Sequence, residues 1–164
     1  MINLHLYRST FQNESRVFRE VNTIEELGIF NEIHLIGVNN NKLLPIENFS
    51  EKITIYRIFK RFKKERKFIT FWKILLWYIF VLLKYWNKNV TCINCHSVNV
   101  LPIAVFLKII TRSKLIYDAH ELETETSALK NFSKFIAKFV EAKLINFSDY
   151  SIFVSKSIEI WYKK

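Results

Sequence analysis

The stretch Lys114-Leu115-Ile116-Tyr117-Asp118-Ala119-His120-Glu121-Leu122-Glu123 decides the fold class. Its apolar run predicts a strand over residues 113–120, which delivers Asp118, His120 and Glu121 to the end of that strand. In an open α/β sheet, ligands bind beyond the carboxyl ends of the strands. A second strand-like run, residues 90–96, closes in the same way with His96. Two strands that each place a histidine at one sheet edge indicate a functional site; the alternative is a polar strand end that caps the next helix.

Strand and helix patterns alternate along the rest of the chain. The predicted strands cover 2–7, 32–38, 53–59, 90–96, 113–120 and 150–154, and the predicted helices lie between Asn13 and Gly28 and over 68–86, 99–111 and 132–147. Asn13 is expected to cap the first helix, and Gly28 is expected to end it. The alternation predicts one α/β domain over residues 1–164, Rossmann-like, with a mostly parallel sheet and helices on both faces.

The composition describes a folded, strongly basic chain. Of its 164 residues 50% are hydrophobic, and the formal net charge is +10. Such a charge predicts an anionic partner, namely lipid headgroups, nucleic acid or a phosphorylated substrate. Nucleic acid is not expected, because no recognised binding motif accompanies the basic residues. The N-terminus lacks the apolar core of a signal peptide, so we expect a cytoplasmic protein with reduced cysteines.

Residues 57–86 join a basic cluster to an aromatic-rich apolar helix. The basic residues are Arg57, Lys60, Arg61, Lys63, Lys64, Arg66 and Lys67, and the helix is expected over 68–86. This combination is typical of a segment that lies on an anionic membrane surface, here the inner face of the membrane. Two alternatives stay open at this point: a core helix with a solvated basic end, and a membrane-spanning helix that Lys73 interrupts.

Two cofactor classes, haem and nicotinamide, are disfavoured by the sequence. Cys92-Ile93-Asn94-Cys95-His96 matches the CxxCH string of haem attachment. In a strand, however, Cys92 and Cys95 point to opposite faces, which disfavours both a haem and a disulfide and favours two buried thiols. A nicotinamide enzyme is also disfavoured, because no GxGxxG sequence follows the first predicted strand.

Several segments together resemble the N-terminal domain of the retaining family 4 glycosyltransferases, which have the two-domain GT-B fold. They are Ser15-Arg16-Val17-Phe18-Arg19-Glu20 with Glu26-Leu27-Gly28, Cys95-His96 with Leu101-Pro102-Ile103-Ala104, Tyr117-Asp118-Ala119-His120-Glu121-Leu122, and Asp149 to Ser155. The resemblance spans nearly the whole chain but only half of a family enzyme. The glycine-rich loop of many members is absent, since Arg8-Ser9-Thr10-Phe11-Gln12 stands in its place.

The resemblance implies a membrane-associated enzyme, of the kind used in polysaccharide biosynthesis, that moves a sugar from a nucleotide-sugar donor to a glycan or lipid-linked acceptor. Such an enzyme is expected to use no metal and no cofactor. The nucleotide-sugar donor is a substrate, and it is expected to be bound mainly by the missing C-terminal domain. This chain alone is therefore expected to be inactive, and a separate C-terminal half is a candidate partner. The alternative is a non-catalytic module that docks on a membrane or a partner subunit.

The resemblance also suggests the site residues. His120 is expected to contact the transferred sugar, with Asp118 and Glu121 shaping its loop. The acceptor side is expected to be lined by His96, Ser9, Thr10, Asn13 and Arg16. Arg16 and Glu20 lie four residues apart on one helix face, so they could also pair for purely structural reasons.

Overall fold

Seven strands form one sheet in the order β3-β4-β2-β1-β5-β6-β7. The computed structural model describes residues 1–40, 42–60, 67–119 and 131–162. The strands are β1 (Ile2–Leu6), β2 (Glu32–Asn39), β3 (Ile46–Asn48), β4 (Ile53–Lys60), β5 (Val90–Cys95), β6 (Lys114–Ala119) and β7 (Tyr150–Phe153). Neighbouring strands pair in parallel except β3, which runs antiparallel to β4 at the edge. The prediction of a Rossmann-like, mostly parallel sheet is confirmed.

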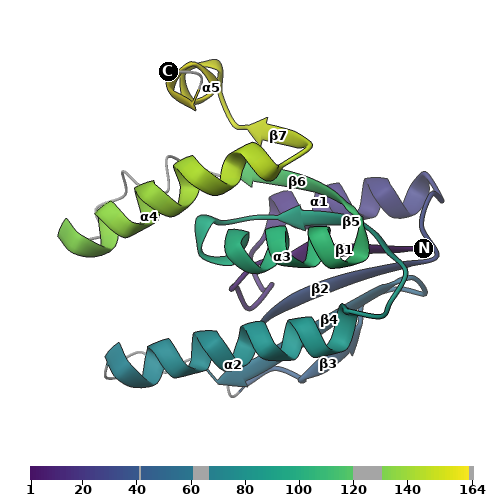
Figure 1. Ribbon diagram of the computed structural model, residues 1–164. Coiled ribbons are helices and arrows are strands. Elements are labelled where there is room, and N and C mark those ends of the chain that lie inside the picture. The colour runs from purple at the N-terminus through teal and green to yellow at the C-terminus, as the bar shows by residue number, and fades with distance from the viewer. Residues whose placement is uncertain (41, 61–66, 120–130, 163–164) are drawn as a thin grey trace.

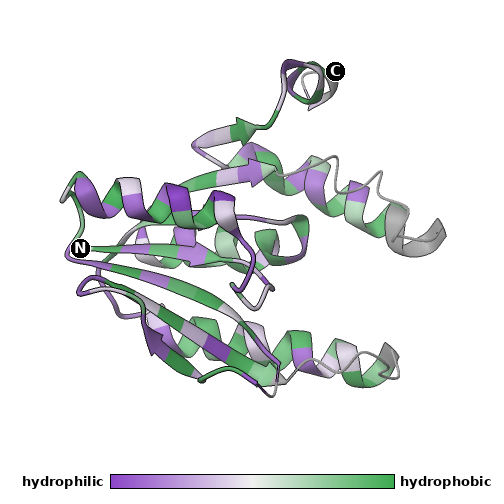
Figure 2. Ribbon diagram, turned by 180° about the vertical axis from the view of Figure 1, so that it is seen from behind, coloured by the Kyte–Doolittle hydropathy of each residue, from purple (hydrophilic) through white to green (hydrophobic). Residues whose placement is uncertain are grey.

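Helices cover both faces of the sheet, as predicted (Figure 1). They are α1 (Ser15–Glu26), α2 (Lys67–Tyr85), α3 (Leu101–Thr111), α4 (Asn131–Leu144) and α5 (Lys156–Tyr162), with short 3₁₀ turns η1 (Val98–Val100) and η3 (Ile145–Phe147). Helix α1 lies on one face, and α2, α3 and α4 lie on the other; Figure 2 shows the α1 face in front. The crossovers β1-α1-β2, β5-α3-β6 and β6-α4-β7 each place a helix against the sheet, whereas β2 and β4 are joined through the short strand β3.

Alternation along β1 assigns its side chains to the two faces. Ile2, Leu4 and Leu6 belong to the larger core beneath α2 and α3. A smaller core beneath α1 joins Val17 and Val21 to apolar residues of β2 and β4. Because successive strand residues face opposite ways, Asn3 and His5 point toward the α1 face. Polar side chains in a buried central strand mark this face as the place to look for a site.

Helix α2 buries only one stripe against the sheet. Trp77, Val81 and Tyr85, spaced four residues apart, are at most 1% exposed. The Trp77 indole N–H donates to the Gly37 carbonyl at 3.0 Å, and the Tyr85 hydroxyl lies 3.0 Å from His34 Nδ1. The exposed apolar residues of this region are Phe68, Ile69, Phe71, Trp72, Leu75, Leu76, Ile79, Leu83 and, just beyond the helix, Trp86. Among the described residues, Phe68–Tyr85 is the one stretch long and apolar enough to cross a membrane, and 17% of it is buried.

The ends of α1 differ in how well they follow the prediction. Gly28 adopts a left-handed φ of 66° just after the helix, as expected of a C-terminal stop. The predicted N-terminal cap of the helix is wrong. The helix begins at Ser15, so the capping position is Glu14 and not Asn13, and Glu14 makes no side-chain cap bond. Glu14 instead accepts a 2.5 Å hydrogen bond from the Ser9 hydroxyl, which ties the helix start to the loop after β1.

Candidate functional site

A buried polar layer lies on the α1 face of β1, β5 and β6. Asn3 and His5 come from β1, Asn94 and His96 from β5 and its end, and Asp118 from β6. Each of the five is at most 1% exposed. Buried polar groups are stable only when they are paired, so their hydrogen bonds define the layer.

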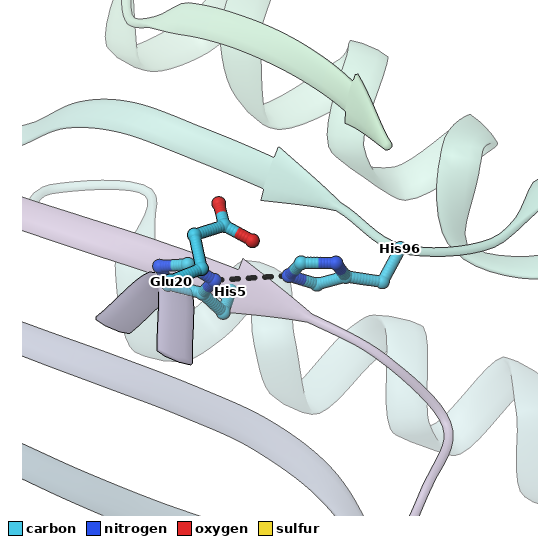
Figure 3. Close-up of side chains that lie close together, drawn as sticks. All are labelled: His5, Glu20 and His96. Carbon is cyan, nitrogen blue, oxygen red and sulfur yellow. Dashed lines mark hydrogen bonds between the residues drawn. The ribbon is translucent and has the colours of Figure 1, made fainter. Parts of the chain in front are cut away.

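Two histidines form the centre of this layer (Figure 3). His5 Nδ1 lies 2.9 Å from His96 Nε2, and the two ring planes are only 16° from parallel. The outer nitrogens face oxygens: His5 Nε2 lies 2.5 Å from Asn3 Oδ1, and His96 Nδ1 lies 3.1 Å from Asp118 Oδ2. The pKa of His5 is well below its usual value, first because burial disfavours the charged imidazolium and then because His96 is close.

Asp118 connects this layer to α1. Its second carboxylate oxygen accepts a hydrogen bond from the Arg16 guanidinium, whose side chain is 31% exposed. A carboxylate that holds an arginine and a histidine at once fixes the end of β6 against α1. Asp118 therefore sets the position from which the chain continues to His120 and Glu121, which lie outside the described residues.

The loop after β1 packs closely on β2. The backbone oxygen of Ser9 accepts the Val38 N–H at 2.9 Å. A Cβ added to Gly37 would lie 2.3 Å from that same oxygen, so only glycine lets the loop approach this closely. The Thr10 carbonyl accepts a 2.7 Å hydrogen bond from the buried Arg57 side chain. Ser9 and Thr10 thus shape the loop through bonds to neighbouring protein groups.

An open pocket of about 310 Å³ lies beside this loop. Its lining consists of Phe11, Gln12, Asn13, Phe18, Leu43, Glu47, Phe49, Ile55 and Arg57. Arg57 also donates to Glu47 at 2.6 Å, so this arginine, counted in the basic cluster of the sequence, is a buried paired group.

The CxxCH motif has the arrangement expected from its place in a strand. Both cysteines are free thiols, Cys95 fully buried and Cys92 partly so. Burial is the main cause that raises the pKa of Cys92 to about 11. The thiol is therefore protonated and unreactive at neutral pH, in agreement with two structural thiols.

The structure brings together three of the predicted site residues. His96, Asp118 and Arg16 form one hydrogen-bonded group, whereas Asn13 lies at the separate pocket. Sequence reasoning missed Asn3, His5 and Asn94 as members of the layer. The available signal was the alternation of polar residues 3 and 5 with apolar residues 2, 4 and 6 in the first strand.

Comparison with known proteins supports the fold. Two structures of sucrose-phosphate synthase from Thermosynechococcus elongatus are similar to this chain. One has a TM-score of 0.68 at 11% identity and covers all of this chain and 82% of its own chain. The other has a TM-score of 0.72 at 10% identity and covers 99% of this chain but 44% of its own. No protein-family model matches, and no curated sequence is significantly similar. At this identity the likeness defines the Rossmann-like fold and leaves function to the site.

Proposed function

We propose that this chain is the acceptor-side domain of a glycosyltransferase that moves a sugar from a nucleotide-sugar donor to a glycan or lipid-linked acceptor at a membrane. The observation that carries the proposal is the fold likeness to sucrose-phosphate synthase, a sugar-transferring synthase by its name, over 99% of this chain. The chain spans 44% of that protein's length, so a donor-binding domain would be supplied from outside these 164 residues. The sequence resemblance to retaining family 4 enzymes supports the same proposal, in which this chain is the N-terminal half of the enzyme.

The position of the polar layer supports this function. His96 and Asp118 lie at the carboxyl ends of adjacent parallel strands, the edge where α/β domains bind ligands. In the proposed enzyme, His120 contacts the transferred sugar across the cleft between domains. Asp118, held by Arg16, positions the segment that carries His120 and Glu121. The loop of Ser9, Thr10 and Asn13 forms the acceptor side, and the buried His96 supports it through its hydrogen bond to Asp118.

The exposed apolar helices support a membrane-bound acceptor. The N-terminal parts of α2 and α4 extend past the sheet in the same direction, on the side of the strand ends (Figure 1). The most exposed aromatic residues there are Phe68 and Phe71 of α2 and Phe135 of α4, each more than 60% exposed. Aromatic side chains suit the membrane interface. A lipid-linked acceptor would then reach the strand ends without leaving the surface.

Contacts of α2 favour a helix that lies on the membrane over one that spans it. Spanning would remove Trp77 and Tyr85 from the sheet and break their bonds to Gly37 and His34. The remaining basic residues from 61 to 66 lie outside the described residues. We expect them to add about 1 kcal/mol each on an anionic surface. We propose that the protein lies on the cytoplasmic face of the membrane.

Sugar transfer by purified material tests the proposal. The 164-residue chain alone should transfer no sugar from any nucleotide-sugar, and activity should appear when it is combined with a donor-binding half. Robust transfer by the chain alone would contradict the division into halves. If no combination is active, the enzyme proposal fails.

The exposed α2 surface also favours the second candidate, a non-catalytic module that docks on a membrane. Both candidates predict binding to anionic vesicles that salt weakens through screening. Replacing Phe71 and Trp72 by serine should abolish this binding, whereas the matched change of buried Trp77 to phenylalanine should keep it. Only the enzyme candidate also predicts sugar transfer that depends on the polar layer. Vesicle binding without transfer in any combination would favour the module.

A further inference from the structure

The hydrogen bonds around the two histidines define what each ring nitrogen faces. The Asn3 amide oxygen faces His5 Nε2 at 2.5 Å and also accepts from Asn94 Nδ2 at 3.2 Å. Reversing both amides would place the Asn94 NH₂ group where its oxygen now is, a buried position with no hydrogen-bond partner among the described residues. An unpaired buried N–H is rarer than an under-paired oxygen, so the assigned orientation is favoured. His5 Nε2 therefore faces the Asn3 oxygen and, at 3.2 Å, the Asn94 amide nitrogen.

The same reasoning applies to the other end of the pair. His96 Nδ1 faces the Asp118 carboxylate at 3.1 Å, and a carboxylate only accepts hydrogen bonds. His96 Nδ1 therefore carries a hydrogen. The inner nitrogens, His5 Nδ1 and His96 Nε2, face each other across 2.9 Å. Either a proton or a metal ion can bridge two ring nitrogens placed in this way.

We propose that His5, His96 and Glu20 form a binding site for a divalent transition metal ion of the zinc type. The ligand atoms of the three residues all lie within 4.8 Å of one another, and Figure 3 shows the Glu20 carboxylate beside the two rings. Imidazole nitrogens and a carboxylate are a donor set that zinc accepts. Glu20 comes from α1, so the ion would join that helix to β1 and to the end of β5.

Three features favour the metal over a single proton shared by the rings. The outer nitrogens already face oxygens, which is the arrangement that orients histidine ligands in metal sites. Glu20 supplies a third ligand atom that a shared proton would not need. Burial disfavours the imidazolium form of His5, whereas a metal binds the neutral ring. Tetrahedral zinc would require the inner nitrogens to separate to roughly 3.3 Å, a shift of a few tenths of an ångström.

The ion would be structural. His5 and His96 are fully buried, so no sugar or phosphate reaches them. The expectation that the proposed transfer reaction uses no metal concerns a different place, the cleft beyond the strand ends. The ion would instead hold α1, and with it Arg16, against β1 and the end of β5, next to strand β6, which carries Asp118.

Metal analysis of the full chain tests the site. Protein stripped with a chelator, exposed to Zn²⁺ and passed over a desalting column should retain one zinc per chain, and its thermal midpoint should rise, because a ligand of the folded state stabilises it. His5→Asn and His96→Asn should reduce retained zinc to background. The matched control is His34→Asn on β2, a buried histidine bonded to Tyr85, which should retain one zinc.

Glu20→Gln provides a second test of the site if the histidine variants fail to fold. Glu20 is only partly buried on α1, so the variant should fold and should bind zinc at least tenfold more weakly. The proposal is overturned if the wild-type chain retains no zinc and shows no thermal shift, the result expected if a shared proton is the only occupant. It is equally overturned if zinc retention is the same in wild type, Glu20→Gln and His5→Asn.

Discussion

Replacing Asp118 by asparagine should destabilise the domain by about 3 kcal/mol. The carboxylate is 1% exposed and accepts hydrogen bonds from Arg16 and His96. Breaking a buried ion pair by removing one partner costs about 3–5 kcal/mol. We expect the lower end, because the Arg16 side chain is 31% exposed and solvent screens part of its interaction. Asparagine also retains one of the two acceptor oxygens.

Urea unfolding followed by circular dichroism measures this loss. With a denaturant slope of about 1–3 kcal/mol/M, the midpoint should fall by about 1–3 M. The matched control is Glu26→Gln at the exposed end of α1, which should change stability by less than about 0.5 kcal/mol. A double-mutant cycle with Arg16→Met isolates the pair. If Asp118→Asn loses less than about 1 kcal/mol, the carboxylate does not hold the layer together as we have inferred.

Three further predictions concern other parts of the domain. Gly37→Ala should lower the unfolding free energy by about 1–3 kcal/mol in the same urea assay, because its Cβ would lie 2.3 Å from the Ser9 carbonyl oxygen; an unchanged midpoint would contradict the close packing. Hydrogen bonds, first from Lys108, hold the pKa of Asp149 below its usual value, so its stabilisation is present above about pH 4 and is lost as the pH falls below that. Asp149→Asn should therefore flatten stability against pH in the acid range, and an unchanged acid limb would refute this. Because the pKa of Cys92 is raised to about 11, only about one thiol in 10⁴ is ionised at pH 7; a thiol reagent should react much faster with the urea-unfolded chain, and equal rates would contradict its protection.

Local patterns were enough to predict most of the fold. The six predicted strands are present, since each is a run of apolar residues long enough to cross a buried sheet. Two elements were missed: β3 has only the three residues Ile46–Asn48 and no alternation, and α5, Lys156–Tyr162, is too short for a helical period. The strand order cannot be predicted from local pattern, because it depends on which strands pair across the whole chain.

The candidate site was only partly predictable for the same reason. His96 and Asp118 are recognisable as polar residues at the ends of apolar runs. His5 and Asn3 occupy alternate positions that also suit a solvent-facing strand surface, and only the central place of β1 in the sheet buries them. Arg16 pairs with Asp118, which is 102 residues away in the chain. Local helix spacing could not show this contact and suggested Glu20 as the partner of Arg16 instead.

The most direct test of the proposed function is the effect of His120→Ala on the complete enzyme, assembled from this chain and its donor-binding half. Turnover and thermal midpoint would be measured together for wild type, His120→Ala and His96→Ala. Removing a hydrogen bond aimed at developing charge lowers the rate by about 10²–10³-fold. We predict a loss of this size for His120→Ala with an unchanged midpoint, and a smaller loss of rate for His96→Ala. Near-normal turnover of His120→Ala, or a loss of activity explained entirely by unfolding, would contradict the assignment of the strand end as the site of sugar transfer.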